Sequence, residues 1–178
     1  MSFELGKAIT LKGDERKRYF RRIGIWLESN PYMGMEELKE ITKKNDIEIL
    51  EQCKSFVKLK QDKFTYIIFT SGNKTNYCWL NLFPIMDLEL LYSLSGDERE
   101  KYTKETMWYW VSSATFSPST SEYILKYFGI EIEKVSDEKY VLKQGNNQYI
   151  VPVKETFYPF EIIESFDVAQ LKKFSEES

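Results

Sequence analysis

The feature that most constrains the fold is the order of helical and strand-like patterns in the first half of the chain. Apolar residues recur at helical spacing in three segments, at residues 14–28, 34–42 and 46–56. Strand-like runs rich in β-branched and aromatic residues follow at 56–60, 63–70 and 75–81. Three helices followed by a hairpin is the order of a winged helix-turn-helix module, which we expect over residues 1–82.

A similar order of patterns begins again at Pro84. Helices are expected over 84–95, 97–115 and 118–129, and strands over 130–135, 139–144 and 148–153. An alignment of residues 48–69 with residues 122–142 suggests a second winged-helix-like unit over residues 83–178. The alternative is one continuous domain in which helices pack on antiparallel sheets. Both interpretations predict an α+β fold.

The chain contains no histidine, and this absence excludes much enzyme chemistry. Nucleophiles activated by histidine, histidine general acids and bases, and histidine-containing zinc sites all require that side chain. Two cysteines cannot complete a zinc site by themselves. We therefore predict no catalytic residue, no metal site and no cofactor. An enzyme that uses carboxylates, lysine or tyrosine stays open as an alternative, although no motif supports it.

The start of the chain, its apolar runs and its cysteines predict where in the cell the protein is found. The start lacks a basic stretch followed by an apolar run, and no segment approaches about 18 consecutive apolar residues. Cys53 and Cys78 are too few for a disulfide framework, so we expect reduced thiols. These features predict a soluble, cytoplasmic protein without a membrane partner.

Basic residues gather on one side of the first predicted helix. Residues 1–63 carry 14 Lys and Arg against 11 Asp and Glu, whereas residues 64–178 carry 11 against 17. Four cations fall on one face of the helix at residues 14–28: Lys17, Arg18, Arg21 and Arg22. Such a face is a candidate site for nucleic acid or for a partner protein, and the alternative is an ordinary solvated helix face.

The segment expected as the recognition helix weakens the nucleic-acid interpretation. A helix over residues 46–57 would present Glu48 and Glu51 on its outward side. Carboxylates that enter a DNA groove meet a strongly negative surface. Contact in the manner of a classical recognition helix is therefore disfavoured, and protein docking is the better prediction.

Aromatic residues make up 16% of the chain, and one cluster is too broad for a single helix face. On the helix expected at residues 97–115, Tyr102, Trp108 and Tyr109 point away from the side that carries Met107 and Val111. We expect these three residues to contact either the other unit or a partner, because Trp and Tyr are enriched at the energetic centres of interfaces.

Together these patterns predict a non-enzymatic protein-interaction or regulatory module, with nucleic acid as a further candidate partner at its basic N-terminal helix. Two alternatives stay open. One is a DNA-binding regulator of transcription or replication, in which the four cations contact phosphates. The other is an acidic inhibitor or immunity-type protein, which blocks another protein through its acidic, aromatic C-terminal part.

Overall fold

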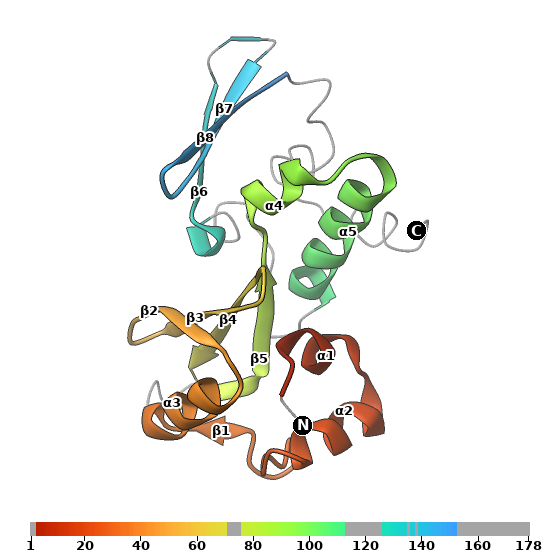
Figure 1. Cartoon of the computed structure of the whole chain (residues 1–178), viewed down its shortest axis with the longest axis vertical. Coiled ribbons are helices and arrows are strands. Elements are labelled where there is room, and N and C mark those ends of the chain that lie inside the picture. Colours follow the sequence, from red (N-terminus) through yellow and green to blue (C-terminus); the bar gives the residue numbers. More distant parts are fainter. Residues whose placement is uncertain (1–2, 71–75, 113–125, 135, 138, 153–178) are drawn as a thin grey trace. The chain divides into compact units, whose positions relative to one another are not determined.

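A computed structural model describes residues 3–70, 76–112, 126–134, 136–137 and 139–152 (Figure 1). The chain divides into two compact units, Met1–Pro84 (unit 1) and Ile85–Ser178 (unit 2). Both units combine helices with antiparallel strands, so the predicted α+β class is confirmed. The division lies close to the boundary predicted between residues 82 and 83.

Unit 1 is built from an antiparallel five-stranded sheet and three helices. The sheet has the order β1-β5-β4-β3-β2, and Figure 1 shows α1 and α2 next to β5. The helices and strands are α1 (Leu5–Thr10), α2 (Gly13–Arg21), β1 (Tyr32–Met33), α3 (Met35–Lys44), β2 (Glu48–Gln52), β3 (Phe56–Gln61), β4 (Phe64–Thr70) and β5 (Tyr77–Ile85).

Three aromatic rings form the centre of the unit 1 core. Trp79 of β5, Phe20 of α2 and Phe3 before α1 are all buried, and each pair of ring centroids is 5.5 Å apart. Rings in tilted and edge-to-face contact at this separation add to the stabilisation that comes from burying their apolar surface. This cluster fixes the first two helices against β5.

Unit 2 contains the helices α4 (Leu88–Ser93) and α5 (Gly96–Ser112), together with residues 126–128 in helical conformation. Its sheet has the order β6-β7-β8, with β6 at Ile130–Lys134, β7 at Lys139–Gln144 and β8 at Asn147–Pro152. The strands predicted at 130–135, 139–144 and 148–153 are therefore confirmed to within one residue at each end.

The two units repeat one arrangement with a constant shift of 83 residues. The first helix begins at Leu5 and Leu88, and the second begins at Gly13 and Gly96. The strand registers agree as well, because Leu59 pairs with Tyr66 in unit 1 and Leu142 pairs with Tyr149 in unit 2. The same shift aligns the tetrapeptide Gly-Asp-Glu-Arg at 13–16 with the identical tetrapeptide at 96–99.

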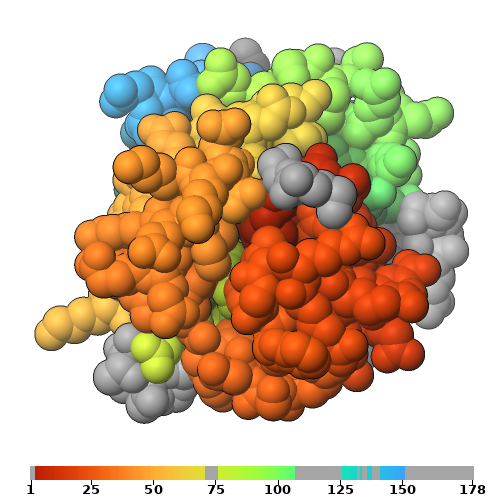
Figure 2. Space-filling view, turned by 60° about the horizontal axis from the view of Figure 1, so that its bottom comes forward, coloured from red at the N-terminus to blue at the C-terminus, as the bar shows by residue number. Residues whose placement is uncertain are grey.

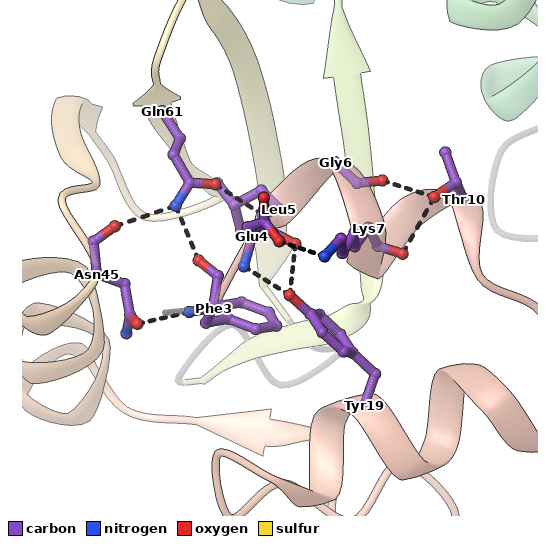
Figure 3. Close-up of polar contacts among 9 residues, drawn as sticks. All are labelled: Phe3, Glu4, Leu5, Gly6, Lys7, Thr10, Tyr19, Asn45 and Gln61. Carbon is purple, nitrogen blue, oxygen red and sulfur yellow. Dashed lines mark hydrogen bonds and ion pairs between the residues drawn. The ribbon is translucent and has the colours of Figure 1, made fainter. Parts of the chain in front are cut away.

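A half-buried glutamine bridge occurs in both units, and Figure 3 shows the copy in unit 1. Gln61, at the end of β3, accepts a hydrogen bond from the Leu5 amide (2.7 Å). Its amide nitrogen donates to the carbonyls of Phe3 (2.8 Å) and Asn45 (3.0 Å). One side chain thus joins the start of α1, the end of α3 and the β3–β4 turn.

The glutamine bridge of unit 2 is made by Gln144, at the end of β7. It accepts from the Leu88 amide (2.7 Å) and donates to the carbonyls of Met86 and Phe128 (both 2.8 Å). Each of these four residues is 83 positions after its counterpart in unit 1. The bridge therefore recurs donor for donor and acceptor for acceptor.

An arginine and a tyrosine complete the repeated framework. Arg16 donates from Nε to the Ala8 carbonyl (3.0 Å), and Arg99 donates from Nε to the Leu91 carbonyl (3.2 Å). Both arginines therefore satisfy a carbonyl near the end of the preceding short helix. The Tyr19 hydroxyl accepts a hydrogen bond from the Glu4 amide (2.8 Å), just as Tyr102 does from the Asp87 amide (3.0 Å).

The helix predicted at residues 46–56 is wrong, because this segment forms β2. Asp46 adopts a left-handed conformation (φ 54°) that ends α3, and Glu48 and Ile49 then pair with Lys60 and Leu59 of β3. The alternation of Ile47 and Ile49 with polar residues is typical of a strand. The winged-helix arrangement, which required a helix here, is not confirmed. The helix predicted at 118–129 lies largely outside the described residues.

Candidate binding surface

The four predicted cations lie on α2 or directly after it. Gly13, in the left-handed conformation (φ 56°), precedes a first turn that contains Asp14 and Glu15, as favoured at a helix N-terminus. Tyr19 and Phe20 face the core. α2 ends at Arg21, seven residues before the predicted end at residue 28, and Arg22 follows it. Lys17, Arg18 and Arg21 therefore lie on α2 and Arg22 directly follows it, so the structure brings the four predicted cations close together along the chain.

The cations differ in how far neighbouring carboxylates neutralise them. Lys17 approaches Asp14 at 3.9 Å, and Arg21 forms an ion pair with Glu28. Arg18 is exposed and makes no ion pair within the described part of the chain. Exposed pairs of this kind hold their partners weakly. The face therefore keeps a positive field on its solvent side; we call Lys17, Arg18, Arg21 and Arg22 the basic face.

An exposed tryptophan adjoins the basic face. The Arg21 guanidinium carbon lies 4.8 Å from the centre of the Trp26 ring, and Trp26 is 53% exposed. The pKa of Glu28 is lowered from its usual value, first by a hydrogen bond from its own backbone amide and further by Arg21. In Figure 2, α2 and the loop after it, coloured orange-red, form an open face of unit 1.

Unit 2 has no comparable basic face on its second helix. A shift of 83 places Glu100, Lys101, Lys104 and Glu105 at the positions of the four cations. These residues pair along the helix, with Lys104 to Glu100 at 3.0 Å and Lys101 to Glu105 at 3.9 Å. The four positions thus carry four positive charges in unit 1 and a neutral set of ion pairs in unit 2.

Trp26 fits the apolar spacing of the helix predicted at residues 14–28, and that spacing predicts a buried side chain. The structure exposes it instead. Gly24, with φ 85°, lies in the turns that follow α2, and the chain then leaves the helical path. This glycine was the available signal, because a left-handed glycine commonly ends a helix.

The predicted aromatic contact residues all lie on α5. The Tyr102 hydroxyl accepts from the Asp87 amide and donates to the Ile85 carbonyl (3.5 Å), both within unit 2. Burial raises the pKa of Tyr102 to about 12. The side chains of Trp108 and Tyr109 lie outside the described residues. That the three contact a partner or the other unit stays a prediction.

Within the described ranges, no group of three or more His, Cys, Asp or Glu residues lies close enough to hold a metal ion. Cys78 is buried on β5, and Cys53 is half-buried between β2 and β3, with its sulfur 3.6 Å from the Ser55 hydroxyl; both thiols are free. Among the described helices, none is both long and apolar enough to cross a membrane.

Comparisons with protein families, curated proteins and solved structures find no match to this chain. The two units of the chain can, however, be compared with each other.

Proposed function

We propose that the protein is a non-enzymatic interaction module that binds an acidic surface of another protein through the basic face of α2. The proposal is carried by the contrast between the second helices of the two units. They begin with the same tetrapeptide and use the same arginine and tyrosine, yet only the helix in unit 1 carries four cations. A regulatory role follows if the partner's activity changes on binding.

The repeat supports a role in binding because it shows which residues the local fold needs and which it does not. Unit 2 builds the same local arrangement with Glu100, Lys101, Lys104 and Glu105 at these positions. The arrangement therefore does not require Lys17, Arg18, Arg21 or Arg22. Clustered like charges repel one another by a few tenths of a kcal/mol or more per pair, so the stability of the helix does not account for four cations at these positions.

Nucleic acid is the second candidate for the anionic partner. Exposed arginines beside an exposed tryptophan suit phosphate contacts combined with base stacking. The helix once expected to enter a DNA groove is strand β2, so a nucleic-acid contact would use α2 itself. The acidic inhibitor alternative would instead place binding on residues 64–178, where acidic residues outnumber basic ones.

The test transplants the surface of unit 2 into unit 1. The exchange variant carries Lys17→Glu, Arg18→Lys, Arg21→Lys and Arg22→Glu, and recreates the i,i+4 pairs of unit 2. Fluorescence anisotropy measures binding of labelled poly-glutamate and labelled double-stranded DNA between about 50 and 200 mM salt. We expect the unmodified protein to bind poly-glutamate and the exchange variant to bind it at least roughly tenfold more weakly.

A matched control separates the basic face from net charge. Lys43→Glu with Lys54→Glu changes the net charge by the same amount at two exposed positions away from α2. This control should retain binding, and both variants should unfold at nearly the temperature of the unmodified protein. Equal loss of binding in the two variants, or no binding of poly-glutamate at all, would contradict the proposal. Tighter, salt-dependent binding to DNA would favour the second candidate.

A further inference from the structure

We infer that the basic face continues into an apolar docking surface formed by Trp26, Tyr32 and Leu80, and that its occupant is an acidic protein segment carrying an aromatic or aliphatic side chain. This inference rests on the proposed function, because it names the chemistry of the partner. The three residues are hereafter the apolar corner of unit 1.

Exposure identifies the apolar corner. Trp26, Tyr32 and Leu80 expose 53%, 46% and 49% of their surfaces. The other exposed large apolar residues of the described chain are Leu50, Phe64 and Ile150. The Phe64 ring has the Lys63 ammonium 5.5 Å from its centre, and Leu50 lies at the irregular register of β2. Single exposed apolar residues are ordinary, whereas several that come together mark an interaction surface.

The strand register brings Tyr32 and Leu80 to one face of the sheet. Tyr32 of β1 lies opposite Cys78 of β5, and the Trp79 amide donates to the Pro31 carbonyl (2.9 Å). Directly opposite residues share a face, and side chains along a strand alternate between faces. Leu80, two residues after Cys78, therefore lies on the face of Tyr32 as its diagonal neighbour.

The loop after α2 brings Trp26 toward the same edge of the sheet. Trp26 forms an isolated antiparallel bridge with Asn30, two residues before Tyr32. The Asn30 amide donates to the Trp26 carbonyl at 2.7 Å, which closes this tight loop. β1 is the outermost strand of the sheet, so the apolar corner lies at its edge.

Arg21 connects the apolar corner to the basic face. Its guanidinium group covers one side of the Trp26 ring and also pairs with Glu28. Arg18 lies one helical turn before Arg21. Trp, Tyr and Arg are the residues enriched at the energetic centres of protein interfaces. A ligand that spans both parts must present negative charge to α2 and an apolar side chain to Trp26, Tyr32 and Leu80.

These details favour a protein segment over a nucleic acid. Leu80 is aliphatic and offers a base no ring to stack on, and Arg21 already covers one side of Trp26. The Glu28 carboxylate stands beside Arg21 and would repel the continuous negative charge of a phosphate backbone. A peptide can place its acidic side chains at α2 and its apolar side chain at the corner, away from Glu28.

The test compares two labelled peptides that have the same number of glutamates. One peptide is otherwise Gly and Ser, and the other also contains Phe and Leu next to the glutamates. We expect the second peptide to bind the full chain roughly tenfold more tightly, as measured by anisotropy. Tyr32→Ser and Leu80→Ser should remove most of this gain and leave binding of the purely acidic peptide unchanged.

Matched controls use exposed apolar residues away from the corner. Leu50→Ser and Ile150→Ser should retain the gain, and circular dichroism with thermal unfolding establishes that each variant is folded. Binding of neither peptide overturns the proposed function and this inference together. Equal binding of both peptides, or equal loss in the corner and control variants, overturns the inference alone. Tighter binding of a single-stranded oligonucleotide than of either peptide would assign the corner to nucleic acid instead.

Discussion

The two units share the side chains that hold the backbone and differ in those that meet solvent. Leu5, Gly13, Arg16, Tyr19 and Gln61 recur unchanged 83 positions later. The side chains of Arg16, Tyr19 and Gln61 make hydrogen bonds to the backbone at the start or end of a helix. The glycine is left-handed in both units, and the leucine is buried. The comparison teaches which positions specify the arrangement and which are available for binding.

One position shows how much variation the framework allows. In unit 1 the Asn45 side chain accepts from the Phe3 amide (2.7 Å) and donates to the Ile41 carbonyl. Its counterpart in unit 2 is Phe128, which is buried instead. The glutamine bridge uses only the carbonyl at this position, so polar and apolar side chains both fit there.

The largest expected effect comes from breaking the glutamine bridge. Gln61→Ala leaves the Leu5 amide and the carbonyls of Phe3 and Asn45 without this partner, and Gln144→Ala does the same in unit 2. We expect each variant to lose about 2 kcal/mol of unfolding free energy in urea titrations, because three backbone groups in a half-buried site lose their hydrogen-bond partner. Gln148→Ala, at an exposed position on β8, is the control and should change little. A large loss in one unit only would show that the two bridges are not equivalent.

A smaller effect, with a pH signature, is expected at Tyr102. Its pKa is raised by burial from 10.0 to about 12, so the neutral hydroxyl is the form that the fold stabilises. The stability that the raised pKa of Tyr102 gives the folded state is present below pH 10 and is lost as the pH rises from about 10 to about 12. Tyr102→Phe should cost about 1 kcal/mol at neutral pH and should lose less stability than the unmodified protein above pH 10.

Denaturant titrations between neutral and alkaline pH check this expectation. Burial also raises the pKa of Tyr92 to about 12. The Tyr102→Phe variant should therefore still lose some stability at alkaline pH. Identical alkaline profiles for the two proteins would contradict the assignment of the buried hydroxyl.

The smallest expected effect lies in the turn after the bridging glutamine. Asp62 and Gly145 occupy equivalent positions with φ 57° and φ 59°, and a Cβ at Gly145 would have no atom within 4 Å. Gly145→Asp should therefore cost less than about 1 kcal/mol, because Asp tolerates the left-handed region. Gly145→Val should cost more, since β-branched residues are strained there. Equal thermal shifts for the two variants would show that the turns differ.

Sequence periodicity predicted β3, β4 and the three strands of unit 2 well, but it missed α1, β1 and β2 and placed helix ends poorly. The segment at 139–144 and the start of α5 near residue 97 were predicted almost to the residue, since turn residues flank both. At 46–56, Ile49, Leu50, Cys53 and Phe56 fit a helix by spacing, and the neighbouring strand β3, which decides the outcome, is not visible in local periodicity.

The repeat itself was only partly visible in the predicted patterns. The alignment of residues 48–69 with 122–142 starts at a shift of 74, whereas the structure has a shift of 83. The identical Gly-Asp-Glu-Arg tetrapeptides would have set the correct shift. The glutamine bridge could not be predicted, because it joins residues 56 and 58 positions apart through one side chain.

The glutamine bridge also creates a hazard during folding. Gln61 is 56 residues from its own partner Leu5 but only 27 residues from Leu88, the equivalent partner in unit 2. Closing the shorter loop costs roughly 0.6 kcal/mol less, so the incorrect pairing is entropically favoured while both units are unfolded. Mispairing between similar units is a known failure of repeated chains. The hydrogen bond from the Phe3 amide to Asn45 opposes the reciprocal exchange, because the Phe128 side chain offers the Phe3 amide no acceptor.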